Sequence, residues 1–188
     1  MRKCLDDKKV EFSDIKNIDL NRFLDERGFF VETYNKRWLK EHQINNDFVQ
    51  DNLSLSLKRN TFRGFHFQLP PFAQSKLIKV LSGSILDIFI DIRKNSKTYK
   101  FYGICELNSD NGLLYIPKGF AHGFITLMDD TIVSYKVDNY YNKESETGIN
   151  FDDYFPYLDL DIIKKDIIIS DKDKDLPLWN EISNKVNF

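Results

Sequence analysis

Residues Lys76–Ile92 read KLIKVLSGSILDIFIDI. Two runs rich in β-branched residues flank a Ser-Gly pair at 82–83, and the second run alternates apolar residues from Leu86 to Ile92 with a period of two. Apolar runs of four to eight residues bounded by turn residues are typical of strands rather than helices. The stretch therefore predicts two strands joined by a tight turn, that is, a β-hairpin.

Similar short apolar runs recur along the chain, and no internal repeat or Pro/Gly/Ser-rich linker separates them. We therefore expect one domain over residues 1–188. Many short strands at close spacing indicate a sandwich, jelly roll or barrel. Helical patterns are confined to Glu32–His42 and Leu176–Val186, which are too short to build the core. The other expected strands are Phe48–Leu57, Arg63–Gln68, Gly112–Ile116, His122–Met128 and Thr131–Val137.

The composition indicates a soluble globular protein and argues against a nucleic-acid or membrane partner. Hydrophobic residues make up 41% of the chain, and 27 basic residues against 29 acidic ones leave a net charge of −2, so a nucleic-acid partner is not expected. Cys4 and Cys105 match neither a metal-ligand spacing nor a redox motif. The start, MRKCLDDKKVEF, has no apolar run like that of a signal peptide, and no stretch approaches the roughly 18 apolar residues of a membrane span. We expect a cytoplasmic protein without a membrane partner.

The chain contains three histidines, and their surroundings differ. His42, in LKEHQ at the end of an expected surface helix, is interpreted as a solvated residue without a role. His66, in FRGFHFQ, is either a core histidine bonded to a backbone carbonyl or a functional base. His122, in IPKGFAHGF, is either a structural residue or a metal ligand. Metal-binding jelly rolls use a His-x-His pair with a carboxylate and a distant histidine, and neither residue has that close partner, so no metal site is expected.

Six sequence blocks, taken together, resemble one known family. In order they read FLDERGFFVETYN, FVQDNLSLS, FRGFHFQLPPFAQSKLIKVLSG, DIFIDIRKNSKTY, LLYIPKGFAHGF and YKVDNYY. With the late Lys172-Asp173 pair they are similar to the dTDP-4-dehydrorhamnose 3,5-epimerase family over roughly Leu20 to Pro177. The resemblance implies an all-β, cupin-like jelly-roll β-barrel with a few short peripheral helices. It also implies a homodimer whose N-terminal strands pair across the two subunits.

The activity that the resemblance implies is inversion of C3 and C5 of a 4-keto-6-deoxy sugar linked to a nucleotide diphosphate, with no metal and no coenzyme. A proton on a carbon next to a ketone is only weakly acidic, so its removal needs a positioned base and stabilisation of the enolate oxygen. Inversion also needs an acid on the opposite face.

The resemblance implies a role for each catalytic group. His66 corresponds to the base, and Asp173 to the carboxylate that orients its imidazole. Lys76 corresponds to the cation that offsets the enolate charge. Tyr135, which alone reads as strand packing, corresponds to the tyrosine that returns a proton from the other face.

The implied binding residues serve the nucleotide and the sugar. Arginine and lysine neutralise a diphosphate, while an aromatic side chain stacks on the base. The positions that match the family are Arg27, Arg63 and Lys172 for the diphosphate, Tyr141 for the base, and Gln50, Asn52, Glu32, His122 and Glu146 for further contacts.

Some positions depart from the family pattern, and alternatives remain open. Where the family usually carries an acidic-Trp-Pro segment, residues Tyr157–Ile162 read YLDLDI, and Pro70-Pro71-Phe72 and Ser75 vary near the site. The main hypothesis is a 3,5-epimerase of dTDP-4-dehydro-6-deoxy-D-glucose. One alternative is an epimerase that inverts only C3 or C5, or that accepts a GDP- or CDP-linked sugar. Another is a non-catalytic cupin that binds a sugar nucleotide.

Overall fold

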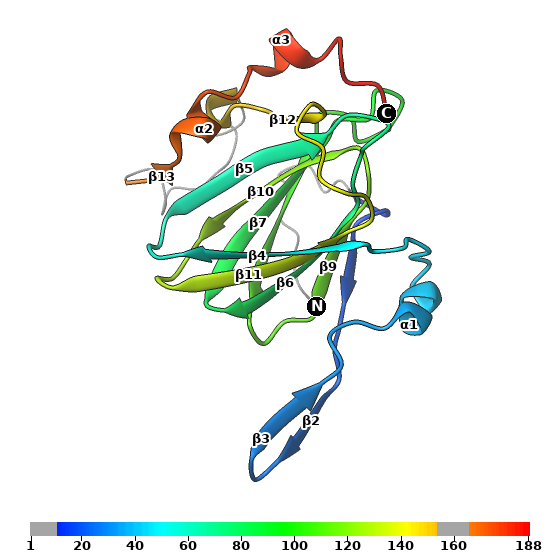
Figure 1. Ribbon diagram of the computed structural model, residues 1–188, viewed down its shortest axis with the longest axis vertical. Helices are drawn as coiled ribbons and strands as arrows, with labels where there is room; N and C mark the ends of the chain where they lie inside the picture. Colours follow the sequence, from blue (N-terminus) through cyan, green and yellow to red (C-terminus); the bar gives the residue numbers. More distant parts are fainter. Residues whose placement is uncertain (1–10, 154–165) are drawn as a thin grey trace.

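The computed structural model describes residues 11–153 and 166–188, and in this part of the chain two β-sheets face each other (Figure 1). One sheet has five strands in the order β1 (Lys16–Ile18), β9 (Leu113–Ile116), β6 (Lys76–Ser82), β11 (Thr131–Val137) and β4 (Gln50–Ser56). The other has the order β12 (Glu146–Gly148), β5 (Thr61–Gln68), β10 (Phe120–Thr126), β7 (Ser84–Asp91) and β8 (Tyr102–Asn108), and β13 (Ile168–Ile169) pairs with β5.

The strands that were predicted from short apolar runs between turn residues are confirmed as β4, β5, β9, β10 and β11, with ends that shift by two residues or fewer. The N-terminal strands, β8, β12 and β13 were not among the predicted strands. The segment Tyr157–Ile162, where the chain departs from the family pattern, lies outside the described residues.

The predicted hairpin over Lys76–Ile92 is wrong. Both strands form, but β6 pairs with β9 and β11, whereas β7 pairs with β8 and β10 in the opposite sheet. Gly83, with a φ of +81°, lies at the corner where the chain passes from one sheet to the other. Alternation indicates that a strand forms but not which sheet it joins. Each of these two strands is an internal strand, with a hydrogen-bonded neighbour on either side.

The core consists of an inner layer between the sheets and two outer layers. The inner layer includes Ile78, Phe89 and Leu114. The outer face of the six-stranded sheet is covered by the C-terminal segment that contains α3 (Trp179–Ile182), whereas α2 (Asp171–Lys174) lies against β5. On the five-stranded sheet, α1 (Lys36–Glu41) buries Leu39. The short helices at both ends of the chain agree with the prediction, although α2 was not predicted.

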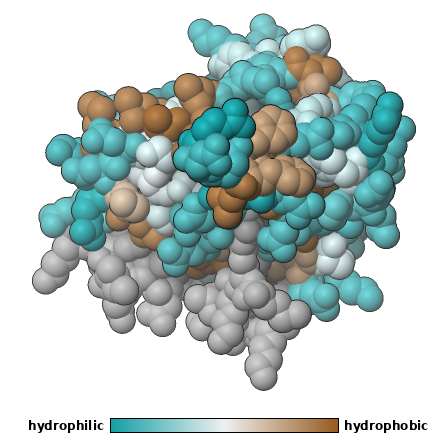
Figure 2. All heavy atoms as spheres, turned by 90° about the horizontal axis from the view of Figure 1, so that it is seen from below, coloured by the Kyte–Doolittle hydropathy of each residue, from teal (hydrophilic) through white to brown (hydrophobic). Residues whose placement is uncertain are grey.

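A small hairpin of β2 (Arg22–Asp25) and β3 (Gly28–Val31) projects from the body of the molecule (Figure 1). Phe23, Leu24, Phe29 and Phe30 on it are between 57% and 80% exposed. Figure 2 views the molecule from this end and shows hydrophobic side chains exposed beside hydrophilic ones at the centre of the face. An exposed group of large apolar side chains of this kind marks a contact surface.

None of the helices in residues 11–153 and 166–188 is long and apolar enough to cross a membrane.

Candidate active site

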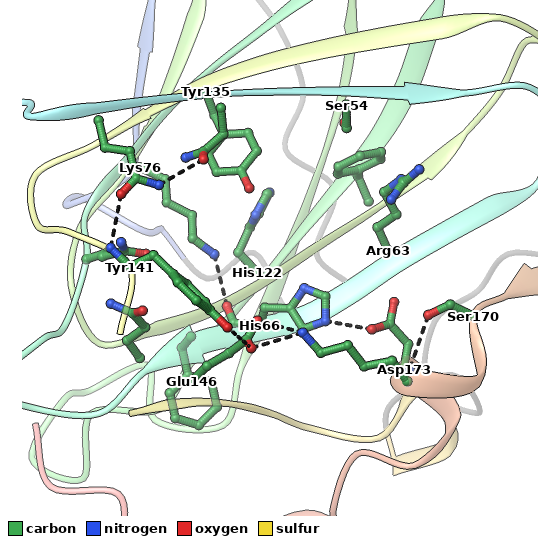
Figure 3. A pocket seen from close by; sticks show the side chains of 17 residues that line it. Ser54, Arg63, His66, Lys76, His122, Tyr135, Tyr141, Glu146, Ser170 and Asp173 are labelled. Carbon is green, nitrogen blue, oxygen red and sulfur yellow. Dashed lines mark hydrogen bonds and ion pairs between the residues drawn. The ribbon is translucent and has the colours of Figure 1, made fainter. Parts of the chain in front are cut away.

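A cavity of about 330 Å³ lies between the two sheets, next to α2 (Figure 3). It is in the size range of small-molecule sites. Most of its wall consists of strand residues, and on β4 the lining residues Gln50, Asn52 and Ser54 alternate with outward-facing neighbours. The lining residues are Gln50, Asn52, Ser54, Arg63, His66, Phe67, Gln68, Gln74, Lys76, His122, Phe124, Tyr135, Tyr141, Glu146, Ser170, Lys172 and Asp173.

The register of β5 and β10 places two histidines side by side. His66 is the direct neighbour of His122, whereas Arg63 is the neighbour of Phe124, so β5 has one residue more than β10 between these pairs. This is a β-bulge, which re-aims side chains. Arg63 and His66 are three positions apart and would face opposite sides of a regular strand, but both line the cavity. Gly64 lies in the bulge with a φ of +142°, and a Cβ there would be 2.5 Å from the Gly123 Cα.

Asp173 on α2 holds the imidazole of His66. The His66 Nε2 and Asp173 Oδ1 atoms are 2.7 Å apart, and Asp173 is 4% exposed. Because a carboxylate only accepts hydrogen bonds, Nε2 donates, and Nδ1 points away from Asp173 with a lone pair that can take a proton (Figure 3). Burial alone would raise the pKa of Asp173, but the hydrogen bond and the charge attraction of His66 outweigh it, so the pKa is lowered and the group stays ionised.

Lys76 extends from β6 in the five-stranded sheet across to the other sheet, where its Nζ donates to the backbone carbonyl of His66 at 3.0 Å. Burial lowers its pKa to about 8, against the attraction of Asp87 and Glu146, which raises it. The ammonium form therefore still predominates at neutral pH. It supplies a cation beside the two histidines.

Tyr135 on β11 lies on the opposite sheet from His66, across the cavity (Figure 3). Burial raises the pKa of its phenol, with a smaller lowering by Arg63. The hydroxyl stays protonated at neutral pH and can donate a proton. A base on one wall and an acid on the other is the arrangement that inversion at a carbon centre requires.

The mouth of the cavity carries a polar network. Glu146 accepts from Lys172 Nζ at 2.9 Å and from the Tyr141 hydroxyl at 2.8 Å. Gln50 donates from Nε2 to Asn52 Oδ1 at 2.9 Å and accepts from the Tyr141 backbone N–H at 3.0 Å. The hydrogen bond from Lys172 lowers the pKa of Glu146, although burial opposes it. The network joins β4, β12 and α2 around the opening of the cavity, where the positive charge of Lys172 and the negative charge of Glu146 lie together.

The comparisons with known proteins agree on one family. The model of the family described as dTDP-4-dehydrorhamnose 3,5-epimerase matches residues 9–181. The chain belongs to this family. An enzyme of that name from Sinorhizobium fredii is 39% identical over 175 residues, which cover 92% of this chain and 89% of the relative.

Two solved structures of the epimerase family are close in fold as well. The Bacillus anthracis enzyme, crystallised with TDP and PPi, has 44% identity and a TM-score of 0.84, and covers 95% of this chain and 99% of its own. The Legionella pneumophila enzyme, in complex with dTDP-4-keto-L-rhamnose, has 34% identity and a TM-score of 0.85, with 100% and 99% covered. The predicted cupin-like fold and isomerase class are thereby confirmed.

The structure brings together eleven of the thirteen site residues that the sequence predicted for this epimerase. Arg27 and Glu32 are outside the cavity of their own chain. Arg27 is exposed on the projecting hairpin and donates to Asp25, and Glu32 accepts from Asn35 and Trp38 near α1. His42 is exposed, as expected, and contacts the Trp38 carbonyl.

Sequence analysis of the epimerase missed several residues at the site. Ser54, Gln68, Gln74 and Ser170 line the cavity, and Asp87 contacts His122 from just outside it. Ser54 follows Gln50 and Asn52 at a spacing of two, which is a signal for the same strand face. Asp87 stands alone in an apolar run, which is the signal of a buried charge. Within the described residues, no cluster of three or more His, Cys, Asp or Glu could hold a metal.

Proposed function

We propose that this epimerase inverts C3 and C5 of dTDP-4-dehydro-6-deoxy-D-glucose, giving dTDP-4-dehydro-L-rhamnose, through an enolate and without a metal or coenzyme. The observation that carries the proposal is the pair of opposed walls: the Asp173-bonded His66 on one sheet and Tyr135 on the other, with Lys76 between them. The relatives crystallised with TDP and with dTDP-4-keto-L-rhamnose support the choice of nucleotide.

The first half-reaction removes a proton from the carbon next to the C4 ketone. His66 Nδ1 takes this proton, and Asp173 stabilises the imidazolium that forms because its carboxylate accepts from Nε2–H. The electron pair of the broken C–H bond moves to the C4 oxygen as an enolate. The Lys76 ammonium, which is itself only 9% exposed, offsets this negative charge.

The second half-reaction returns a proton to the opposite face of the same carbon. Tyr135 donates its phenolic proton, the enolate electrons form the new C–H bond, and the ketone is restored. The same two groups then serve the other carbon next to the ketone. Each inversion leaves His66 protonated and Tyr135 deprotonated, so a proton must pass back through solvent before the next step.

The nucleotide belongs at the mouth of the cavity. Tyr141, 53% exposed, offers a ring for the base, and Arg63 and Lys172 offer positive charge for the diphosphate. Lys172 is paired with Glu146 in this structure, so its ammonium must be shared with the phosphate when substrate binds. Gln50, Asn52, Glu146 and His122 are the further polar contacts.

The functional unit that we propose is a homodimer. Two apolar surfaces have no cover within the described residues: the β2–β3 hairpin, and the outer face of β4 with Leu53 and Leu55, which Leu57 extends just beyond the strand. β4 is also the last strand of its sheet, and an uncovered apolar edge strand is a pairing site. A hairpin that docks on a second copy would carry Arg27 and Glu32 toward the partner subunit, which accounts for their distance from the cavity of their own chain.

The dimer is tested with Phe30→Asp on the hairpin, because a carboxylate there would be buried in the interface. Light scattering at micromolar concentration should give a dimer for the wild type and a monomer for Phe30→Asp. Leu178→Asp, at an exposed position near α3 on the far side of the molecule, should stay dimeric. A monomeric wild type would rule the proposal out.

The cytoplasmic location remains a prediction from the sequence.

The activity is tested by incubation with dTDP-, GDP- and CDP-linked 4-keto-6-deoxy sugars in deuterated water. The proposal expects deuterium at both C3 and C5 of the dTDP sugar with both centres inverted, and His66→Ala should lose this exchange by a factor of roughly 10² to 10⁴. Deuterium at one carbon would indicate a mono-epimerase, and a GDP or CDP preference would change the substrate. Binding without exchange would indicate the non-catalytic alternative.

A further inference from the structure

Asp87 is a carboxylate in an otherwise apolar layer. It lies on β7 between Ile85 and Phe89, which share its face of the strand, and all three are 0% exposed. A buried charge is destabilising unless other groups compensate it. An apolar residue could pack at this position without a carboxylate, so packing does not explain why Asp87 is there. The groups that compensate its charge indicate what the residue does.

One compensating group is His122 on the neighbouring strand β10. The His122 Nε2 and Asp87 Oδ2 atoms are 2.8 Å apart, whereas Asp87 Oδ1 has no hydrogen-bond partner in the described residues. Because the carboxylate accepts, Nε2 carries the hydrogen, and the neutral ring then has its lone pair on Nδ1. Burial lowers the pKa of His122, with Asp87 opposing and Lys76 and His66 adding to the lowering, so the ring is neutral at pH 7.

The other compensating group is Lys76, whose buried Nζ donates to the carbonyl of His66, the direct neighbour of His122 on β5, and which is attracted by the charge of Asp87. Lys76 sits beside two imidazoles, and burial alone would favour its neutral amine. The other charged or titratable groups around this part of the cavity come from five elements and one loop: His66 and Arg63 on β5, His122 on β10, Tyr135 on β11, Glu146 on β12, Lys172 and Asp173 on α2, and Tyr141.

We propose that Asp87 is a positioning residue with two effects: it holds His122, which lines the cavity, through Nε2 so that Nδ1 is left to accept a hydrogen bond, and it places a negative charge beside the Lys76 ammonium. In catalysis, which rests on the proposed function, the His122 lone pair accepts a hydrogen bond from a sugar hydroxyl while the ammonium faces the C4 oxygen. The site thus presents one acceptor and one cation from two adjacent side chains. Asp87 itself does not touch the substrate.

The first test is the pH profile of kcat/KM for Asp87→Asn, which has the same shape without the charge. The wild-type profile should fall on the alkaline side with a midpoint near 8, because Lys76 loses its proton there. In Asp87→Asn this midpoint should move down by about one pH unit, since a nearby opposite charge raises a lysine pKa by that order. Asp91→Asn, at a buried carboxylate on the same strand that bonds Arg93 instead, should keep the wild-type midpoint. An unchanged midpoint in Asp87→Asn would overturn the proposal.

The second test needs no change at Asp87 and no activity. Histidine labelled with ¹⁵N in a His42→Gln background leaves two imidazoles, and His66→Gln then identifies His122. The expected spectrum is a neutral Nε2–H ring for His122 at neutral pH, and an imidazolium or an Nδ1–H form would overturn the proposal. Absence of epimerase activity with the expected spectrum would instead count against the proposed function and leave the role of Asp87 in holding His122 intact.

Discussion

Ser54 has a hydroxyl that lines the cavity but has no hydrogen-bond partner in the described residues. A buried polar group without a partner costs free energy, so the bound sugar nucleotide is the natural partner. We expect Ser54→Ala to leave the melting temperature unchanged or raised, and to raise KM by roughly two- to tenfold, the equivalent of one hydrogen bond. Thermal denaturation and steady-state kinetics measure the two effects.

Ser56, two residues along the same strand, is the matched control for Ser54. Its hydroxyl already accepts from Arg63 Nε at 3.1 Å. Ser56→Ala should therefore lower the melting temperature, in contrast to Ser54→Ala. A destabilised Ser54→Ala with an unchanged KM would contradict the assignment of its hydroxyl to the substrate.

Tyr135 separates proton exchange from inversion. Tyr135→Phe removes only the hydroxyl on the five-stranded sheet, so His66 can still form the enolate and return the proton to the original face. We expect deuterium exchange at C3 and C5 to continue while inversion falls by roughly 10² or more. Nuclear magnetic resonance of the product gives both quantities in one experiment.

The control for this substitution is Tyr115→Phe. Tyr115 is also a buried tyrosine, but its hydroxyl donates to Asn46 outside the cavity. Its loss should leave the ratio of exchange to inversion at the wild-type value. Inversion at the wild-type rate in Tyr135→Phe would exclude this tyrosine as the acid.

At the level of elements, α2 matters because it carries Asp173. This four-residue helix is held at its C-terminal end by Asn150, whose Nδ2 donates to the carbonyls of Lys174 at 2.7 Å and Leu176 at 3.1 Å. Asn150 does not line the cavity. Asn150→Ala should cost about 1–3 kcal/mol of stability for two hydrogen bonds. It should also lower kcat, because Asp173 orients His66, and raise KM, because Lys172, the proposed diphosphate contact, lies on the same helix.

Asn108→Ala is a suitable comparison for the helix test, since Asn108 accepts from the N–H groups of Asp110 and Asn111 in a loop away from the cavity. It should lose stability without losing kcat. Equal losses of kcat in the two variants, measured at a temperature where both are folded, would contradict the role of α2.

For the whole molecule, Lys76 makes stability and activity respond to pH in opposite directions. Its folded pKa of about 8 lies below its usual 10.5, so between these values the unfolded chain binds more protons than the folded one. Stability from this group therefore rises with pH across that window. Activity falls over the same window because the ammonium ion is lost. Urea unfolding and kcat/KM measured from pH 7 to pH 10 should show the two trends. A parallel fall of both would mean that alkaline inactivation is unfolding.

Much of the fold and most of the site follow from local patterns along the chain. A period of two is visible in β4 and β11, because a strand with one buried face must alternate. The blocks around His66, Lys76, His122 and Tyr135 carried the family resemblance, and these residues do line one cavity. These features depend on near neighbours in sequence, which is why they could be predicted.

Pairing between distant segments was decided only in the folded chain. The corner at Gly83 sends β6 and β7 to different sheets, and the bulge at Gly64 turns both Arg63 and His66 into the cavity. Ser54 and Asp87 became functional candidates only through their surroundings, since a hydroxyl without a partner and a carboxylate opposite a histidine are properties of packing. The sequence by itself determines which side chains a strand presents to each face. The register and the sheet that the strand joins determine which residues those side chains contact, because both depend on pairing with segments far away in the sequence.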